Sequence, residues 1–207
     1  MNKPSQQAPE QIVHLRITLD DIKPKVSRLI AVPFGIWLDG LHLVFQAAMG
    51  WTNSHLYMIQ ARDCAWGMPA PDFGDNELLP ANKSTLADLV ADTAAKRFKY
   101  VYDFGDDWQH SVRIEKLTIA APGVGYPLLL EATGRCPPED VGGREGYAEM
   151  LSVLSDPAHE RHAEFVEWYG RDFDPKAVDT DRLEQAVAAL AKLMGRRKVP
   201  KPKSRKT

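Results

Sequence analysis

The chain has 207 residues, of which 44% are hydrophobic and 26% are charged, a composition typical of a globular protein with one sizeable core. No apolar run approaches the roughly 18 residues of a membrane span, and the polar start of the chain lacks a signal-peptide core. We therefore expect a cytoplasmic protein with no membrane contact. The cysteines, Cys64 and Cys136, form no C-x-x-C unit, so they imply neither a disulfide framework nor a cysteine zinc site.

The formal net charge of −2 is distributed unevenly along the chain. Seven cations and no acid lie in the last twelve residues: Arg196, Arg197, Lys198, Lys201, Lys203, Arg205 and Lys206. The remaining chain carries 19 cations against 28 acids, and this acidic body disfavours nucleic-acid binding. We expect a disordered N-terminus at 1–10, one domain at 11–195, and a basic disordered tail at 196–207 that could associate weakly and non-specifically with nucleic acid.

The first part of the chain predicts two strands, a helix and a third strand. Alternating apolar residues predict strands over 12–19 and 26–32, which are good candidates for a hairpin. Asp39 is a candidate N-cap for a helix through Met49, and His42 falls on the side opposite its apolar face. A further strand is expected from His55 to about residue 61.

The middle of the chain predicts a long loop, a short helix and a second hairpin. Residues 63–83 are rich in Pro, Gly, Asp and Asn, which indicates a loop that could cover a binding surface. Thr85 begins a capping-box pattern for a helix to about residue 94. Strands are expected over 98–104 and 110–120, with a turn at Gly105 between them.

The last part of the chain is mainly helical. A short strand at 128–130 precedes a proline-rich loop at 135–143, and helices follow over 147–154, 159–168 and 181–194. Because strands come mostly first and helices last, we predict an α+β fold. The expected architecture is a single domain with a mostly antiparallel sheet of about five strands packed against helices.

Acidic and aromatic residues gather in three predicted loops, which makes these loops the best candidate site. The residues are Trp51 and His55; Tyr102, Asp103, Asp106, Asp107, Trp108 and His110; and Cys136, Glu139 and Asp140. If the loops converge, Asp106, Asp107, His110 and Glu139 could hold a divalent metal ion that activates water for hydrolysis. The alternative is that the acids cap turns and pair with arginines. A further alternative uses Cys136 as a nucleophile with His110 as its base.

Four segments resemble the plasmid pRiA4b Orf3-like family. They are residues 47–51 with His55 and Leu56, residues 102–110, residues 136–143 with Gly146 and Tyr147, and residues 168–175. The resemblance implies an α+β domain of bacterial and archaeal proteins, often near plasmids or other mobile elements, with no established activity. Tyr57 and Val141 depart from the family pattern, which lowers the case for a Cys/His metal centre.

The residues favour a non-enzymatic binding or adaptor domain. An acidic surface edged by Trp51, Tyr102 and Trp108 would take a protein segment or a cationic ligand, since rings supply contact area and acids supply charge complementarity. Burial of Trp51 and Trp108 in the core would count against this hypothesis. A metal-dependent hydrolase and nucleic-acid association through the tail are the alternatives, so enzymatic activity stays an open question, and no cofactor is expected beyond a possible divalent metal.

Overall fold

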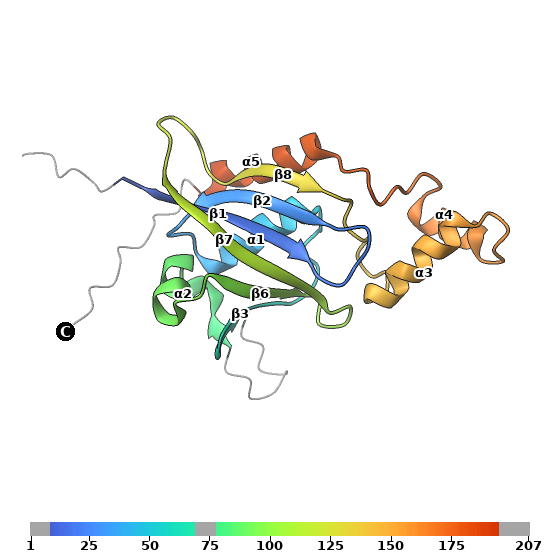
Figure 1. Cartoon of the computed structure of the whole chain (residues 1–207), viewed down its shortest axis with the longest axis horizontal. Coiled ribbons are helices and arrows are strands. Elements are labelled where there is room, and N and C mark those ends of the chain that lie inside the picture. The colour runs from blue at the N-terminus through green and yellow to red at the C-terminus, as the bar shows by residue number, and fades with distance from the viewer. Residues whose placement is uncertain (1–8, 69–77, 195–207) are drawn as a thin grey trace, which may run out of the picture.

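Eight strands form one mixed sheet in the computed structural model, which describes residues 9–68 and 78–194 (Figure 1). The strands are β1 (Gln11–Leu19), β2 (Ser27–Pro33), β3 (Tyr57–Ala61), β4 (Cys64–Gly67), β5 (Leu79–Pro80), β6 (Arg97–Tyr102), β7 (Trp108–Ile119) and β8 (Leu128–Thr133). Their spatial order is β5-β4-β3-β6-β7-β1-β2-β8, and every neighbouring pair is antiparallel except β4 and β5. The two predicted hairpins, β1–β2 and β6–β7, are confirmed.

The expected number of about five strands is wrong, because the predicted loop at 63–83 contains two strands. β4 follows β3 through a tight turn at Arg62, and its Trp66 is buried against the core. β5 has two residues and pairs in parallel with β4. Strands of four and two residues are too short to show an alternating pattern, so only the pairing partner reveals them. The fold class remains α+β. Phe73, the second expected anchor of this loop, lies outside the described residues.

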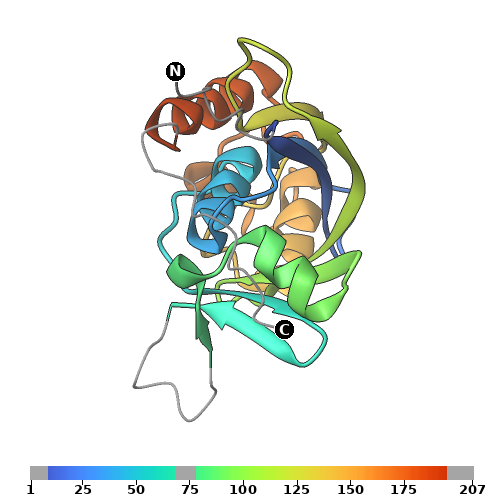
Figure 2. The same ribbon diagram turned by 90° about the vertical axis from the view of Figure 1, so that its left-hand side faces the viewer.

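The helices cover one face of the sheet and one end of it. They are α1 (Leu38–Met49), α2 (Leu86–Thr93), α3 (Gly143–Ser155), α4 (His162–Tyr169) and α5 (Thr180–Met194), with a 3₁₀ turn, η2, at Ala81–Lys83. The sheet curves around α1, as Figure 2 shows, and α5 packs against α1 and β8. α3 and α4 pack on each other beyond one end of the sheet (Figure 1). The opposite face of the sheet therefore carries no helix in the described part of the chain.

The caps of two helices follow from their sequences, with one correction. Trp37 rather than Asp39 is the N-cap of α1, and Asp39 lies in the first turn, where a carboxylate favours the positive end of the helix dipole. Gly50 ends α1 in the left-handed conformation, with φ of 87°, which glycine adopts without steric strain. At α2, Thr85 and Asp88 form the predicted capping box.

The core lies between α1 and the sheet. Leu15, Ile17 and Ile30 from the strands, with Leu41 and Phe45 from α1, are all fully buried. The inward residues of β1 are the ones that the period-two pattern predicts. Among the described helices, none combines the length and apolar character needed to cross a membrane.

Candidate functional site

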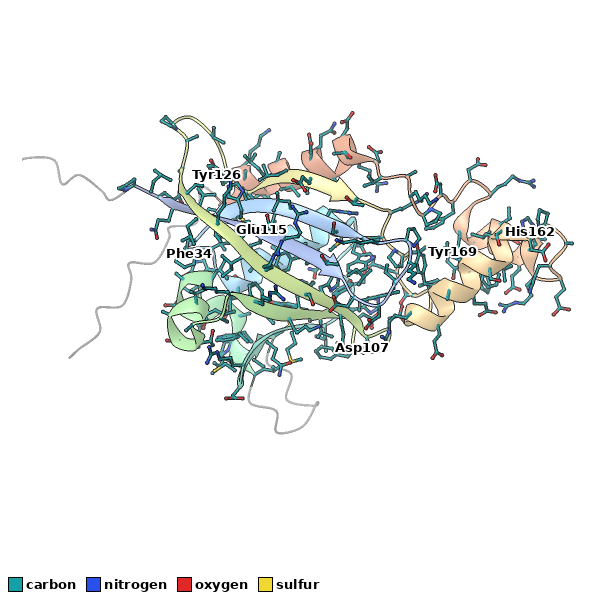
Figure 3. The ribbon with its side chains drawn as sticks, in the orientation of Figure 1. Phe34, Asp107, Glu115, Tyr126, His162 and Tyr169 are labelled. Atoms are coloured by element: carbon teal, nitrogen blue, oxygen red, sulfur yellow. The ribbon has the colours of Figure 1, made fainter. Side chains whose placement is uncertain are left out.

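The structure brings the three candidate loops together at the end of the sheet next to α3. The β6–β7 hairpin is tied to the segment before β3 by a hydrogen bond from the Asp103 amide to the Leu56 carbonyl, 2.8 Å long. The loop before α3 is tied to the same segment, because Nε1 of Trp51 donates to the Pro137 carbonyl at 3.0 Å. Asp107 lies at the tip of the hairpin (Figure 3). Residues from three distant parts of the sequence therefore share one surface.

His55 lies between two carboxylates at the centre of this surface. Its Nδ1 is 3.6 Å from Oδ2 of Asp103, and its Nε2 is 3.1 Å from Oδ1 of Asp140. Although Nε2 is buried and close to Asp140, it makes no hydrogen bond among the described residues. One donor atom from each of the three side chains lies within 4.8 Å of the others. Asp140 is largely exposed, so a solvent-borne cation can reach the group.

Glu139 fixes the loop before α3 in place. Oε1 of Glu139 accepts a hydrogen bond from the Tyr102 hydroxyl at 2.5 Å, and Oε2 accepts from the Thr52 amide at 3.0 Å and from the Thr52 hydroxyl. Burial, together with the bond to Glu139, raises the pKa of Tyr102 well above its usual value, so the phenol remains a donor. Both oxygens of Glu139 are thus engaged in holding two loops together.

The structure does not bring together the four residues expected to hold a metal ion. In the described ranges, the close group of metal-capable side chains consists of His55, Asp103 and Asp140. His110 is fully buried, its Nδ1 lies 3.1 Å from the Tyr100 carbonyl, and burial lowers its pKa to about 4. His110 is consequently a neutral core residue.

The aromatic residues expected to edge a binding surface are buried. Trp51, Tyr102 and Trp108 are 8%, 0% and 1% exposed. The Trp51 ring stacks on Tyr102 with centroids 5.1 Å apart and meets the edge of His110 at 5.4 Å. The expectation that these rings edge an exposed surface is therefore wrong, because they are packed in the core beneath the loops. The ring of Phe104, which lies in the turn of the same hairpin, is exposed.

Cys136 lacks the surroundings of a nucleophile. Its thiol donates to the sulfur of Met49 at 3.3 Å and accepts from the guanidinium of Arg28 at 3.6 Å. Burial raises the pKa of Cys136 to about 11, although the Arg28 charge opposes this. The thiol stays protonated near neutral pH, and no hydrogen bond joins it to His110.

A buried polar network next to the site was missed by the sequence analysis, which placed His42 on the outer side of α1. His42 is 3% exposed, with Nδ1 2.9 Å from the Tyr100 hydroxyl and Nε2 2.5 Å from Oδ1 of Asn53. Gln46, one turn further along α1, donates to the same hydroxyl at 2.8 Å. A polar pair four residues apart on one helix, His42 and Gln46, is the signal that could have revealed this network.

A cavity of about 530 Å³ is lined both by His42 of the buried network and by His55 of the site. Left-handed backbone conformations gather at the same place: Asn53, Asp103, Asp107 and Asp140 all have positive φ. Such residues concentrate at functional loops, where the surrounding structure holds them. The seven cations of the predicted basic tail lie outside the described residues.

The comparisons with known proteins identify the family. The model of the family described as "Plasmid pRiA4b ORF-3-like protein" matches residues 11–182. The uncharacterized protein y4hQ of Sinorhizobium fredii (strain NBRC 101917 / NGR234) is 53% identical over 181 residues, which cover 87% of this chain and 92% of the relative. The crystal structure of a protein of unknown function, MM3350 from Methanosarcina mazei Go1, matches with a TM-score of 0.73 and 35% identity, covering 84% of this chain and 98% of that one. The chain therefore belongs to the plasmid pRiA4b ORF-3-like family.

Proposed function

We propose that the chain is a non-enzymatic binding domain that takes a cationic protein segment at the three converging loops. The acidic loop site is defined here as His55 with the carboxylates of Asp103, Asp106, Asp107, Glu139 and Asp140. One observation carries the proposal: across residues 9–68 and 78–194, none of these five carboxylates forms an ion pair with a lysine or an arginine. A surface with this excess of one charge favours a ligand of the opposite charge.

The details of the site support a ligand that donates hydrogen bonds. Oδ2 of Asp106 is buried and has no hydrogen-bond partner among the described residues. Such an acceptor is costly to leave unsatisfied, and a guanidinium or ammonium group would satisfy it. Phe104 is 42% exposed beside these acids and offers apolar contact to the stem of a long cationic side chain.

The proposal is tested with an arginine-rich peptide as a defined probe. Fluorescence anisotropy would compare the wild-type chain with an Asp103→Asn, Asp140→Asn variant. Asn keeps an Oδ1 acceptor for the two amides that Asp103 binds, so the turn is retained. The control variant, Asp92→Asn with Asp172→Asn, removes the same charge from exposed positions outside the site.

We expect the site variant to weaken peptide binding about tenfold or more, and the control to change it little, since charge pairs in a specific site contribute more than distant ones. Equal losses in both variants would show that only net charge matters and would contradict the proposal.

A divalent metal ion at His55, Asp103 and Asp140 is the second candidate, and the 4.8 Å grouping of their donor atoms favours it. One imidazole nitrogen and two carboxylates suit an ion such as Mn²⁺ or Zn²⁺. Elemental analysis by mass spectrometry, on protein purified without chelator, should then find near-stoichiometric metal that is lost in His55→Ala and retained in Asp107→Asn. Metal-free wild-type protein would reject this candidate.

A further inference from the structure

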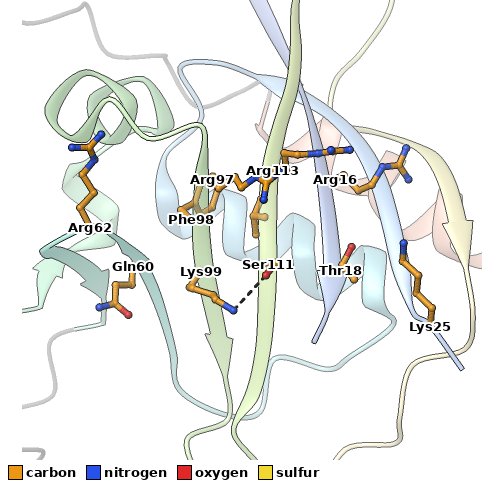
Figure 4. Close-up of a pocket in the computed structure, with 11 residues that line it drawn as sticks. Arg16, Thr18, Lys25, Gln60, Arg62, Arg97, Phe98, Lys99, Ser111 and Arg113 are labelled. Carbon is orange, nitrogen blue, oxygen red and sulfur yellow. Dashed lines mark hydrogen bonds between the residues drawn. The ribbon is translucent and has the colours of Figure 1, made fainter. Parts of the chain in front are cut away.

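The open face of the sheet carries a shallow basic groove. The groove has a volume of about 570 Å³, and its lining includes six cations: Arg16, Lys25, Arg62, Arg97, Lys99 and Arg113 (Figure 4). They come from β1, β6 and β7 and from the turns after β1 and β3. This face lies opposite the side of the sheet that α1 and α5 cover (Figure 1). The groove is thus separate from the acidic loop site at the end of the sheet.

The register of the strands places three arginines in a row. Arg97 of β6 is the direct cross-strand partner of Arg113 of β7, and Arg113 is the partner of Arg16 of β1. A parallel row of polar residues lies two positions further along the strands, where Gln60 pairs with Lys99, Lys99 with Ser111, and Ser111 with Thr18. Like charges directly opposite on neighbouring strands destabilise a sheet. A row of this kind therefore suggests an anionic ligand.

Acidic residues compensate only part of this charge. Glu115 pairs with both Arg16 and Arg113 at 2.7 Å, and Glu131 pairs with Arg16 at 2.9 Å. Lys99 pairs with Asp20 at 2.6 Å.

The other three cations of the groove are uncompensated. Arg62, Arg97 and Lys25 form no ion pair and no side-chain hydrogen bond with any described residue. The groove thus keeps an excess of free guanidinium and ammonium donors.

The chemistry of the lining selects among anionic partners. None of the large exposed hydrophobic side chains of the described residues lines the groove, whereas a protein partner usually meets an apolar centre. Phe98 is the aromatic residue of the lining, and it is 4% exposed, so the described residues offer no ring in the groove for base stacking as in single-strand binders. What remains is recognition of phosphates by arginine and lysine.

We infer that this groove binds the phosphate backbone of double-stranded DNA without reading its sequence. The three arginines in the row span two strand spacings, about 10 Å, which is about the axial rise of three nucleotides of duplex. The acidic residues, which repel DNA, are not spread evenly along the chain: residues 135–194 alone hold thirteen acids against seven cations. Those residues form the loop and helices beyond the sheet end and α5 on its other face.

The test measures binding of a fluorescein-labelled random-sequence duplex by anisotropy, over a range of salt concentrations. The full chain is used, so the tail contributes equally to every variant. The groove variant is Arg62→Ala with Arg97→Ala, two exposed side chains that form no ion pair and no side-chain hydrogen bond with a described residue. The matched control, Lys83→Ala with Arg171→Ala, removes two exposed cations outside the groove. Thermal melts confirm that both variants are folded.

Losing two phosphate contacts should lower the slope of log affinity against log salt by about 1.8 and weaken binding on the order of 10- to 100-fold at ~0.1 M salt. The control should behave as wild type. The inference is overturned if both variants bind alike, if a single strand binds more tightly than the duplex, or if polyglutamate of equal charge competes as well as duplex. An Asp103→Asn, Asp140→Asn variant should bind duplex as wild type does, which separates this test from that of the acidic loop site.

Discussion

Acidification is expected to destabilise the protein through its two buried histidines, His42 and His110. Burial lowers the pKa of each to about 4 from the usual 6.5. Because the folded-state pKa lies below the unfolded one, the unfolded chain takes up protons first. The stabilising contribution is therefore complete above about pH 6.5 and is lost as the pH falls towards about 4.

The magnitude follows from these pKa values. Between about pH 7.5 and about pH 5.5, one such histidine lowers the free energy of unfolding by about 1.3 kcal/mol, and two lower it by roughly twice that amount. The side chains are almost fully excluded from water, so solvent screening reduces this contribution little. A loss of this size is a large fraction of the stability of an ordinary domain.

Urea unfolding followed by tryptophan fluorescence measures the effect, and a His110→Phe variant isolates one histidine. Other titrating groups act equally in both proteins, so the difference between their pH dependences belongs to His110. We expect the variant to lose about 1.3 kcal/mol less than wild type over the same pH interval. Identical pH dependences would show that His110 takes up its proton at the same pH in the folded and unfolded states, which would contradict the lowered pKa.

Two further predictions concern packing and hydrogen bonding. A Cβ atom on Gly146 would lie 1.9 Å from a backbone carbonyl oxygen of the preceding loop, so Gly146→Ala should destabilise the fold by about 3 kcal/mol in calorimetric melting. In the control Gly125→Ala, the added Cβ would lie 3.9 Å from its nearest atom, so this substitution should be nearly neutral. Trp51→Phe removes a hydrogen bond to a loop carbonyl, while Nε1 of Trp108 has no partner among the described residues. In urea titrations, Trp51→Phe should therefore cost about 1 kcal/mol more than Trp108→Phe, and the reverse order would contradict the assigned bonding.

Local patterns predicted the regular elements well wherever those elements are long. The alternation in β1 and the capping box at Thr85 depend on neighbours along the chain, so their signals survive without tertiary context. The same reasoning failed for β4 and β5, which are stabilised by pairing with β3 and with each other. It also misplaced His42, because α1 is enclosed on more than one side and its polar residues find partners inside.

In the candidate site, too, some features follow from the sequence and others only from the tertiary structure. The sequence indicated that three loops carry carboxylates, and the structure brings these loops together around His55. The sequence alone could not show that Asp103 and Asp140 lie next to His55, or that Glu139 accepts a hydrogen bond from Tyr102. It also could not show that the tryptophan rings are buried beneath the loops. These outcomes depend on which side of each loop packs against the buried aromatic rings.

The sequence by itself determined the α+β class, two hairpins and the family, since each of these rests on residue patterns along the chain. The tertiary structure alone decided which polar groups meet. Arg16 and Arg113 are far apart in sequence, and only the strand register makes them neighbours in a basic row. Burial likewise depends on the whole fold, because a side chain is removed from water only when elements from several parts of the chain close over it.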